Sequence, residues 1–159
     1  MSKSLKRVRA ALEDAGAGNA CANIREMPDQ TRTARQAADA VGVEIDQIAK
    51  SIIFRGEASG TAILFVTAGG NQVCADKASA LAGEPLGKAD AALIRAQTGF
   101  AIGGVSPVGH LSPIRAFFDP KLAEFSEIWA AAGTPRHVFP LSPGDLQKTS
   151  NSQTADFTQ

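Results

Sequence analysis

The chain of 159 residues is poor in cysteine and contains no long hydrophobic run. Cys21 and Cys74 stand far apart, which favours two reduced structural thiols over a disulfide or a zinc pair. No apolar run approaches the roughly 20 residues that a membrane span needs. The basic start "MSKSLKRVRA" leads into "ALEDAGAG", which is too polar for a secretory signal. We therefore expect a cytoplasmic protein that does not enter a membrane.

The chain also lacks an excess of either charge, since 16 lysines and arginines face 16 aspartates and glutamates. A protein that grips long nucleic acid without sequence preference usually has a clear basic excess. Specific DNA binding is therefore not expected, and any nucleic acid should be recognised at a short terminus held in a pocket. The two histidines have no third ligand at metal-binding spacing, so we expect neither a metal nor another cofactor.

The periodicity of the apolar residues predicts a mixed α/β fold in a single domain over residues 1–159, with a weakly specified tail at 151–159. Thr33 stands three residues before Gln36, as in a capping box, and Gly42 is expected to end the same helix. Asp76 and Ser142 are expected to cap two later helices. The predicted helices cover residues 5–15, 33–42, 76–83, 88–99 and 142–150. The predicted strands cover an antiparallel pair at 50–56 and 61–70, and further segments at 100–104, 114–118, 126–131 and 137–140.

Lys50 is the first candidate for a functional residue. It follows the short helix-like turn "EIDQIA" and begins the apolar strand "SIIF". Flanked by Ala49 and Ile52, its ammonium is placed to face a partly enclosed cleft and to hold an anionic group such as a phosphate. The alternative is a lysine at a strand end whose stem packs on apolar surface while its charge stays in water.

The stretch "TGFAIGGVSPVGH", residues 98–110, is the second candidate. Its start has strand-like apolar character, whereas Gly103 and Gly104 remove the side chains and Pro107 removes a backbone donor. Glycines let a ligand approach the main chain, and successive N–H groups can form a concavity for an anion or a carbonyl. Ser106 adds a hydroxyl. We expect this loop to hold the carbonyl end of a ligand; the alternative is a β-bulge or a tight corner.

Two other patterns carry less weight. Ser106, His110 and Asp119 contain the residue types of a hydrolase triad, but no nucleophile-elbow sequence accompanies them. The segment "AGGNQ", residues 68–72, lacks the pattern of a phosphate-binding loop and predicts a hairpin turn.

Four segments occur in order along the chain: "IAKSIIF", "TGFAIGGVSPVGH", "RAFFDP" and "EIWAAAGTPRHVF". Together they resemble the YbaK family, the free-standing relatives of the editing domain of bacterial prolyl-tRNA synthetase. The resemblance extends from about residue 5 to residue 150. The segments "TRTARQAADAVG" and "GTPRH" are closest to the stand-alone ProXp proteins, which edit in trans. The resemblance implies a YbaK-like α/β fold, a distorted mixed β-barrel or sheet surrounded by short helices.

The resemblance also implies an activity: hydrolysis of the ester between a wrong amino acid and the 3′ end of a tRNA. Mischarged tRNA is then the expected partner, with prolyl-tRNA synthetase as a second one. The implied reaction needs no metal, acyl-enzyme or protein general base, because the terminal ribose hydroxyl assists the attacking water. In this family Lys50 would lie against the terminal nucleotide, and the main chain of residues 103–107 would position the aminoacyl group.

Combining both lines of reasoning gives the predicted site. The predicted catalytic residues are Lys50, Gly103 and Ser106. The predicted substrate-binding residues are Gly104, Val105, Pro107, Thr31, Thr33, Phe100, Ile102, Gly133, Thr134 and His137. Among these, Phe100, Ile102 and residues 133–137 are expected to form the pocket wall. Thr31 and Thr33 are expected at its mouth, although entry into a helix also explains Thr33.

A tight pocket can admit alanine and exclude the larger proline, which is the size discrimination that synthetases need for small apolar side chains. The expected substrate is therefore alanine, or a similarly small residue such as 2-aminobutyrate, on proline tRNA. The alternative is a non-catalytic module of the same fold that binds a tRNA acceptor end or a synthetase. The amino acid removed and the oligomeric state are left open by the sequence.

Overall fold

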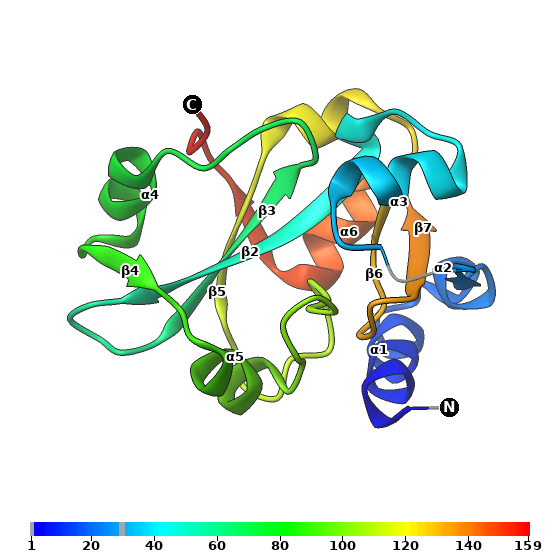
Figure 1. Cartoon of the computed structure of the whole chain (residues 1–159), viewed down its shortest axis with the longest axis horizontal. Helices are drawn as coiled ribbons and strands as arrows, with labels where there is room; N and C mark the ends of the chain where they lie inside the picture. The colour runs from blue at the N-terminus through cyan, green and yellow to red at the C-terminus, as the bar shows by residue number, and fades with distance from the viewer. Residues whose placement is uncertain (1, 29–30) are drawn as a thin grey trace.

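The computed structural model describes residues 2–28 and 31–159, and its centre is one mixed sheet of eight strands (Figure 1). The strands are β1 (Arg25–Glu26), β2 (Ile48–Gly56), β3 (Ala62–Ala68), β4 (Leu86–Lys88), β5 (Arg115–Phe118), β6 (Ile128–Ala131), β7 (His137–Leu141) and β8 (Ser152–Thr154). The α-helices are α1 (Lys3–Asp14), α2 (Gly18–Ala22), α3 (Ala34–Val41), α4 (Ala75–Ala82), α5 (Ala91–Thr98) and α6 (Pro143–Ser150). Two 3₁₀ helices, η1 (Ile45–Gln47) and η2 (Pro120–Glu124), complete the elements.

The strand order is β1-β7-β6-β2-β3-β5-β8, and β4 pairs with β2 beside this path. The long pair β2–β3 is antiparallel, as predicted, and Lys50 lies opposite Thr67 in its register. β2–β6, β3–β5 and β5–β8 are parallel. Over the described residues the order runs from β1 to β8 without closing on itself, so the expected α/β fold takes the form of an open sheet and not of a barrel.

Helices cover both faces of the sheet. Successive side chains of β3 point to opposite faces, so they enter two different cores. Leu64 and Val66 join the larger core with α1 and α6, whereas Ile63 and Phe65 pack with α4 on the other face. A third core packs α3 against β2, β6 and β7. It groups Ala38 of the helix with Ile48, Trp129 and Val138 of the three strands. No helix within residues 2–28 and 31–159 has the length and apolar character to cross a membrane.

Several local predictions are confirmed in detail. Thr33 caps α3, and its hydroxyl accepts a hydrogen bond from the Gln36 amide at 3.1 Å, but Gln36 Oε1 accepts from the Arg32 amide, so the second bond of a capping box is absent at Thr33. Gly42 ends that helix in the left-handed conformation. Ser142 caps α6 by accepting from the Asp145 amide. The strands predicted at 114–118, 126–131 and 137–140 correspond to β5, β6 and β7.

Other local predictions are wrong. No strand forms at 100–104, because Gly103 has a φ of 95° and the Gly104 amide closes a turn onto the Ala101 carbonyl. Asp76 does not cap α4, whose N-cap is Cys74. The elements α2, β4 and η2 were not predicted as such, whereas η1 lies within the predicted helix-like turn "EIDQIA". They are short, and short elements depend more on tertiary packing than on local periodicity.

The C-terminal tail also differs from the expectation of a weakly specified segment. Residues 152–154 form β8, which extends the sheet in parallel with β5. Phe157 is fully buried in the core beside α4, and its carbonyl accepts from the Cys74 amide. The tail therefore completes the sheet edge and one core, which no periodic pattern in "NSQTADFTQ" indicates.

Candidate functional site

One cavity of about 300 Å³ brings together residues that the sequence analysis selected from four separate segments. It lies between the start of α3, the first half of β2, the loop after α5 and the turn between β6 and β7. Figure 1 shows that loop reaching from α5 toward β6. The predicted site residues in the lining are Lys50, Gly103, Val105, Thr31, Thr33, Ile102, Thr134 and His137.

The lining of this cavity has an uneven charge distribution. It includes the cations Arg32 and Lys50, and none of the residues that the structure describes adds an aspartate or glutamate to it. The remaining wall is largely aliphatic, with Ile48, Ile53 and Val138 among its members. Cations beside an apolar wall suit a small ligand that has an anionic end and an apolar end.

Lys50 is held in a defined position on the strand side of the cavity. Its Nζ donates a hydrogen bond to the backbone carbonyl of Asn71 at 2.6 Å, and the side chain is half-buried. Burial lowers the pKa of the Lys50 ammonium below its ordinary value, while the negative charges of Asp119 and Asp46 act in the opposite direction. The lysine is therefore tethered inside the protein, unlike one that projects freely into water.

The turn that holds Lys50 is itself fixed by two carboxylates. Asp119, which is 1% exposed, accepts from the Ala68 amide at 3.0 Å and from Asn71 Nδ2 at 2.9 Å. Asp46 accepts from the Gly70 amide at 2.8 Å. The hairpin turn predicted at residues 68–72 is wrong, because β3 leads into α4 and does not pair with a strand directly after it, and this arrangement was not predicted. Asn71 and Asp119 follow the ends of β3 and β5, and these strands are parallel neighbours, so the two side chains meet at one sheet edge.

The two glycines on the opposite side have different surroundings. A Cβ on Gly103 would meet no atom within 4 Å, so this residue borders open space. A Cβ on Gly104 would lie 2.8 Å from the Thr134 backbone. Gly103 is therefore the residue beside which a ligand can sit, and Gly104 allows the loop to pack tightly against the turn between β6 and β7.

Comparison with known proteins assigns the family. The model of the aminoacyl-tRNA editing domain matches residues 28–149, most of the chain. The chain belongs to the aminoacyl-tRNA editing domain family. The match confirms the resemblance to the YbaK family drawn from the sequence.

Three relatives resemble this editing domain over nearly their whole length. A structure described as that of a candidate trans-editing enzyme for prolyl-tRNA synthetase is 45% identical, with a TM-score of 0.91, and the similarity covers 100% of this chain and 99% of that one. The hypothetical protein APE2540 is 25% identical, with a TM-score of 0.85, over 96% and 99% of the two chains. The uncharacterized protein YwhH of Bacillus subtilis (strain 168) is 31% identical over 150 residues, which are 94% of this chain and 93% of that protein.

Some predicted site residues of the editing domain lie outside the cavity lining: Ser106, Phe100, Gly104, Pro107 and Gly133. The Ser106 hydroxyl is fully buried and accepts from the Val108 amide at 3.3 Å. It therefore stabilises the loop on the side that faces the protein interior. Phe100 is fully buried in the larger core, with the Arg7 guanidinium 4.6 Å above its ring. These two side chains support the loop and do not face the cavity.

The hydrolase triad considered from the sequence is not assembled. His110 Nε2 contacts the backbone carbonyl of Ser106 at 2.7 Å, not its hydroxyl. Burial also lowers the pKa of His110. The carboxylate of Asp119 already accepts hydrogen bonds from Ala68, Asn71 and the Lys121 amide. Within residues 2–28 and 31–159, moreover, no three His, Cys, Asp or Glu side chains are grouped as a metal site.

His137 and Thr134 form a linked pair on the cavity wall. His137 Nδ1 lies 2.6 Å from Thr134 Oγ1, and the same hydroxyl accepts from the Arg136 amide at 3.2 Å. The turn between β6 and β7 therefore fixes the orientation of the imidazole, and both side chains line the cavity.

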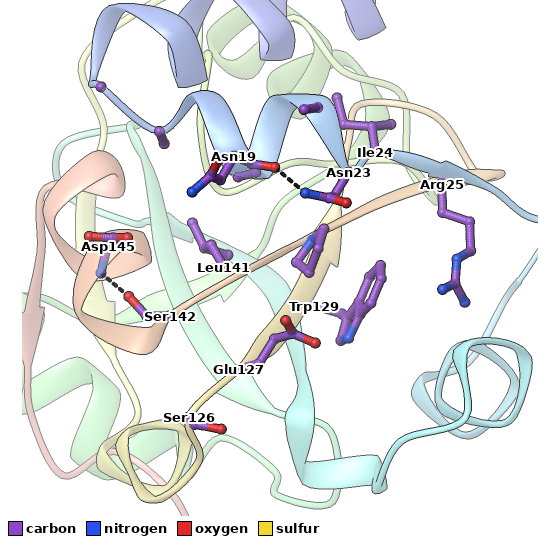
Figure 2. A pocket seen from close by; sticks show the side chains of 15 residues that line it. Asn19, Asn23, Ile24, Arg25, Ser126, Glu127, Trp129, Leu141, Ser142 and Asp145 are labelled. Carbon is purple, nitrogen blue, oxygen red and sulfur yellow. Dashed lines mark hydrogen bonds between the residues drawn. The ribbon is translucent and has the colours of Figure 1, made fainter.

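A second cavity, of about 660 Å³, lies near α2, the ends of β6 and β7, and α6 (Figure 2). Its lining is polar and of mixed charge, with Arg25 on one side and the carboxylates of Glu127 and Asp145 on others. Arg25 lies over the ring of Trp129, which lines both cavities. None of the predicted site residues lines this larger cavity, so size alone does not identify the site.

Proposed function

We propose that this editing domain is an aminoacyl-tRNA deacylase that hydrolyses mischarged tRNA in trans. The proposed substrate is a small amino acid, such as alanine, on proline tRNA. Family membership supports the aminoacyl-tRNA part of the proposal. The relative described as a candidate trans-editing enzyme for prolyl-tRNA synthetase supports the choice of proline tRNA.

One observation carries the proposal: Lys50 and Gly103 line the same small cavity, and within residues 2–28 and 31–159 no acidic side chain joins them there. The cavity is at the lower end of the volumes of small-molecule sites. Only the aminoacylated 3′ end of a tRNA is small enough to enter it. The ammonium of Lys50 and the guanidinium of Arg32 favour the phosphate that precedes the terminal adenosine.

The proposed chemistry needs positioning more than a protein base, because an aminoacyl ester is already activated. Lys50 would hold the terminal nucleotide while the main chain near Gly103 would orient and polarise the ester carbonyl. Water would then attack that carbon with help from the neighbouring ribose hydroxyl. The ester C–O bond breaks, the ribose oxygen takes a proton, and the amino acid leaves as a carboxylic acid. Ser106 has no direct part in this scheme, since its hydroxyl is buried behind the loop.

The proposed selectivity rests on the aliphatic wall. Ile53, Ala130 and Val138 leave room for a small side chain, and filling an apolar pocket can distinguish ligands by about 1–3 kcal/mol per methylene. Proline is larger than alanine and has a rigid ring. Exclusion of prolyl-tRNA would protect the correct product from hydrolysis.

The test is a deacylation panel with purified full-length protein. Alanyl-, cysteinyl-, seryl- and prolyl-tRNA are incubated separately, and loss of the ester is followed over time. We expect alanyl-tRNA bearing a proline anticodon to be hydrolysed fastest and prolyl-tRNA to be spared. Binding of all four without ester loss would instead identify a non-catalytic module that recognises the acceptor end.

A further inference from the structure

We propose that the buried Asp119, together with Asn71, is a positioning device for Lys50. The inference rests on the proposed function, in which Lys50 holds the terminal nucleotide. It concerns residues outside the cavity lining, and neither residue touches the substrate in this scheme.

The connection consists of successive hydrogen bonds. Lys50 Nζ donates to the Asn71 carbonyl at 2.6 Å, and Asn71 Nδ2 donates to Asp119 Oδ2 at 2.9 Å. The same carboxylate oxygen accepts from the Ala68 amide, and Oδ1 accepts from the Lys121 amide. Asp119 thereby joins the end of β3, the start of η2 and the turn that holds the lysine. The position of the Asn71 carbonyl, and hence of the ammonium, depends on this buried group.

Asp119 is also placed to act through its charge. It is 1% exposed, and a carboxylate in such surroundings keeps a larger effect on a nearby cation than one in water. Burial disfavours the charged form of Lys50, and the negative charges of Asp119 and Asp46 offset this. Arg32 and His137 line the same cavity, and they remain unchanged in the variants considered below.

Substitutions of Asp119 and Asn71 distinguish the effect of the hydrogen-bond geometry from the effect of the buried charge. Asp119→Asn removes the charge and places an amide beside the Asn71 amide, so both the charge effect and the connection are weakened. Asn71→Ala removes only the side-chain connection and keeps the buried carboxylate and the backbone carbonyl. Asp145→Asn is the matched control, because Asp145 is an exposed carboxylate in the other cavity.

The pH dependence of the deacylation activity follows from the direction in which the Asp119 charge changes the pKa of Lys50. Lys50 is charged below its pKa and loses the proton as the pH rises through it. Removing the Asp119 charge lowers that pKa further, so activity that needs the ammonium should be lost at a lower pH in Asp119→Asn. A purely structural defect would reduce activity by the same factor at every pH.

The experiment measures kcat/KM on alanyl-tRNA against pH, and the titration of the Lys50 ammonium by NMR. Its signal is assigned by its loss in Lys50→Arg. We expect kcat/KM at neutral pH to fall about tenfold in both variants, because a misplacement of about an ångström is sufficient for such a loss. The Lys50 titration should move to lower pH only in Asp119→Asn, and Asp145→Asn should match the wild type.

Two results would overturn the inference. One is a Lys50 titration in Asp119→Asn identical to that of the wild type, with a loss of activity that does not vary with pH. The other, decisive if Asp119→Asn fails to fold, is wild-type kcat/KM in a folded Asn71→Ala. If the wild type hydrolyses none of the aminoacyl-tRNAs, the proposed function fails, and the NMR titration still decides whether Asp119 controls Lys50.

Discussion

The two walls of the cavity are built by different physical means. On the strand wall, the charged side chain of Lys50 donates to the Asn71 carbonyl, and the Asn71 side chain donates to the buried carboxylate of Asp119. On the loop wall, the main chain itself borders the cavity, and its shape depends on Gly103 and Gly104. The first wall is specified by polar groups brought together from distant segments, and the second by local backbone geometry. Substitutions should therefore affect the two walls differently.

The largest effect is expected on the strand wall. Lys50→Ala removes the one lysine found in the cavity lining over the described part of the chain, and deacylation should fall about a hundredfold, as when one preorganised donor is lost at an active site. Because the side chain is only half-buried, thermal unfolding should change little. Lys148→Ala, an exposed lysine on α6, is the control and should keep full activity. Activity close to that of the wild type in Lys50→Ala would remove Lys50 from the mechanism.

On the loop wall, Gly104→Ala should mainly affect packing. The new Cβ would lie 2.8 Å from the Thr134 backbone, and such overpacking costs about 1–3 kcal/mol. We expect a lower free energy of unfolding and reduced deacylation, since the whole loop must move. Denaturant titration and kinetic assays measure the two effects. Unchanged stability would mean that the loop and the turn between β6 and β7 are not in close contact in solution.

Gly103→Ala is the companion substitution, with a smaller expected effect. Its Cβ meets nothing within 4 Å, so the cost comes from the φ of 95° and amounts to about 1–2 kcal/mol. We expect less destabilisation than in Gly104→Ala. Gly103→Val, which fills the space beside the proposed ester, should lower kcat/KM further than Gly103→Ala does. Equal kcat/KM in these two variants would argue that no ligand approaches this residue.

The smallest effect is expected at the mouth of the cavity. Thr33→Ala removes the N-cap of α3 and should cost about 1 kcal/mol of stability. KM for alanyl-tRNA should stay constant, because the Gln36 amide already occupies the hydroxyl. Thr33→Ser should restore the stability. A raised KM in Thr33→Ala would instead support the substrate-binding role that the sequence suggested.

Much of the fold could be predicted because it is encoded locally. The caps at Thr33 and Ser142 and the antiparallel pair of β2 and β3 each involve segments close in the sequence, and all of them are confirmed. The prediction of a strand at 100–104 was wrong, because the apolar residues were given more weight than Gly103 and Gly104, which form a turn. The strand β8 was missed because its stability comes from the edge of β5, which lies far away in the sequence.

The predicted site residues also divide into those that line the cavity and those that do not. Lys50 and Gly103 were selected from local sequence, and the structure places both in the lining of one cavity, while their roles remain predictions. Phe100 and Ser106 were selected by the same reasoning but face the protein interior. A strand or loop has two sides, and the sequence within it does not state which side faces a cavity.

The sequence by itself determined the caps of α3 and α6, the antiparallel pair of β2 and β3, and the family, because these depend on residue types at short or fixed spacing. Only the tertiary structure decided that Asn71 and Asp119 meet beside Lys50. Their meeting requires the parallel pairing of β3 with β5, and such a pairing is a contact between segments about fifty residues apart.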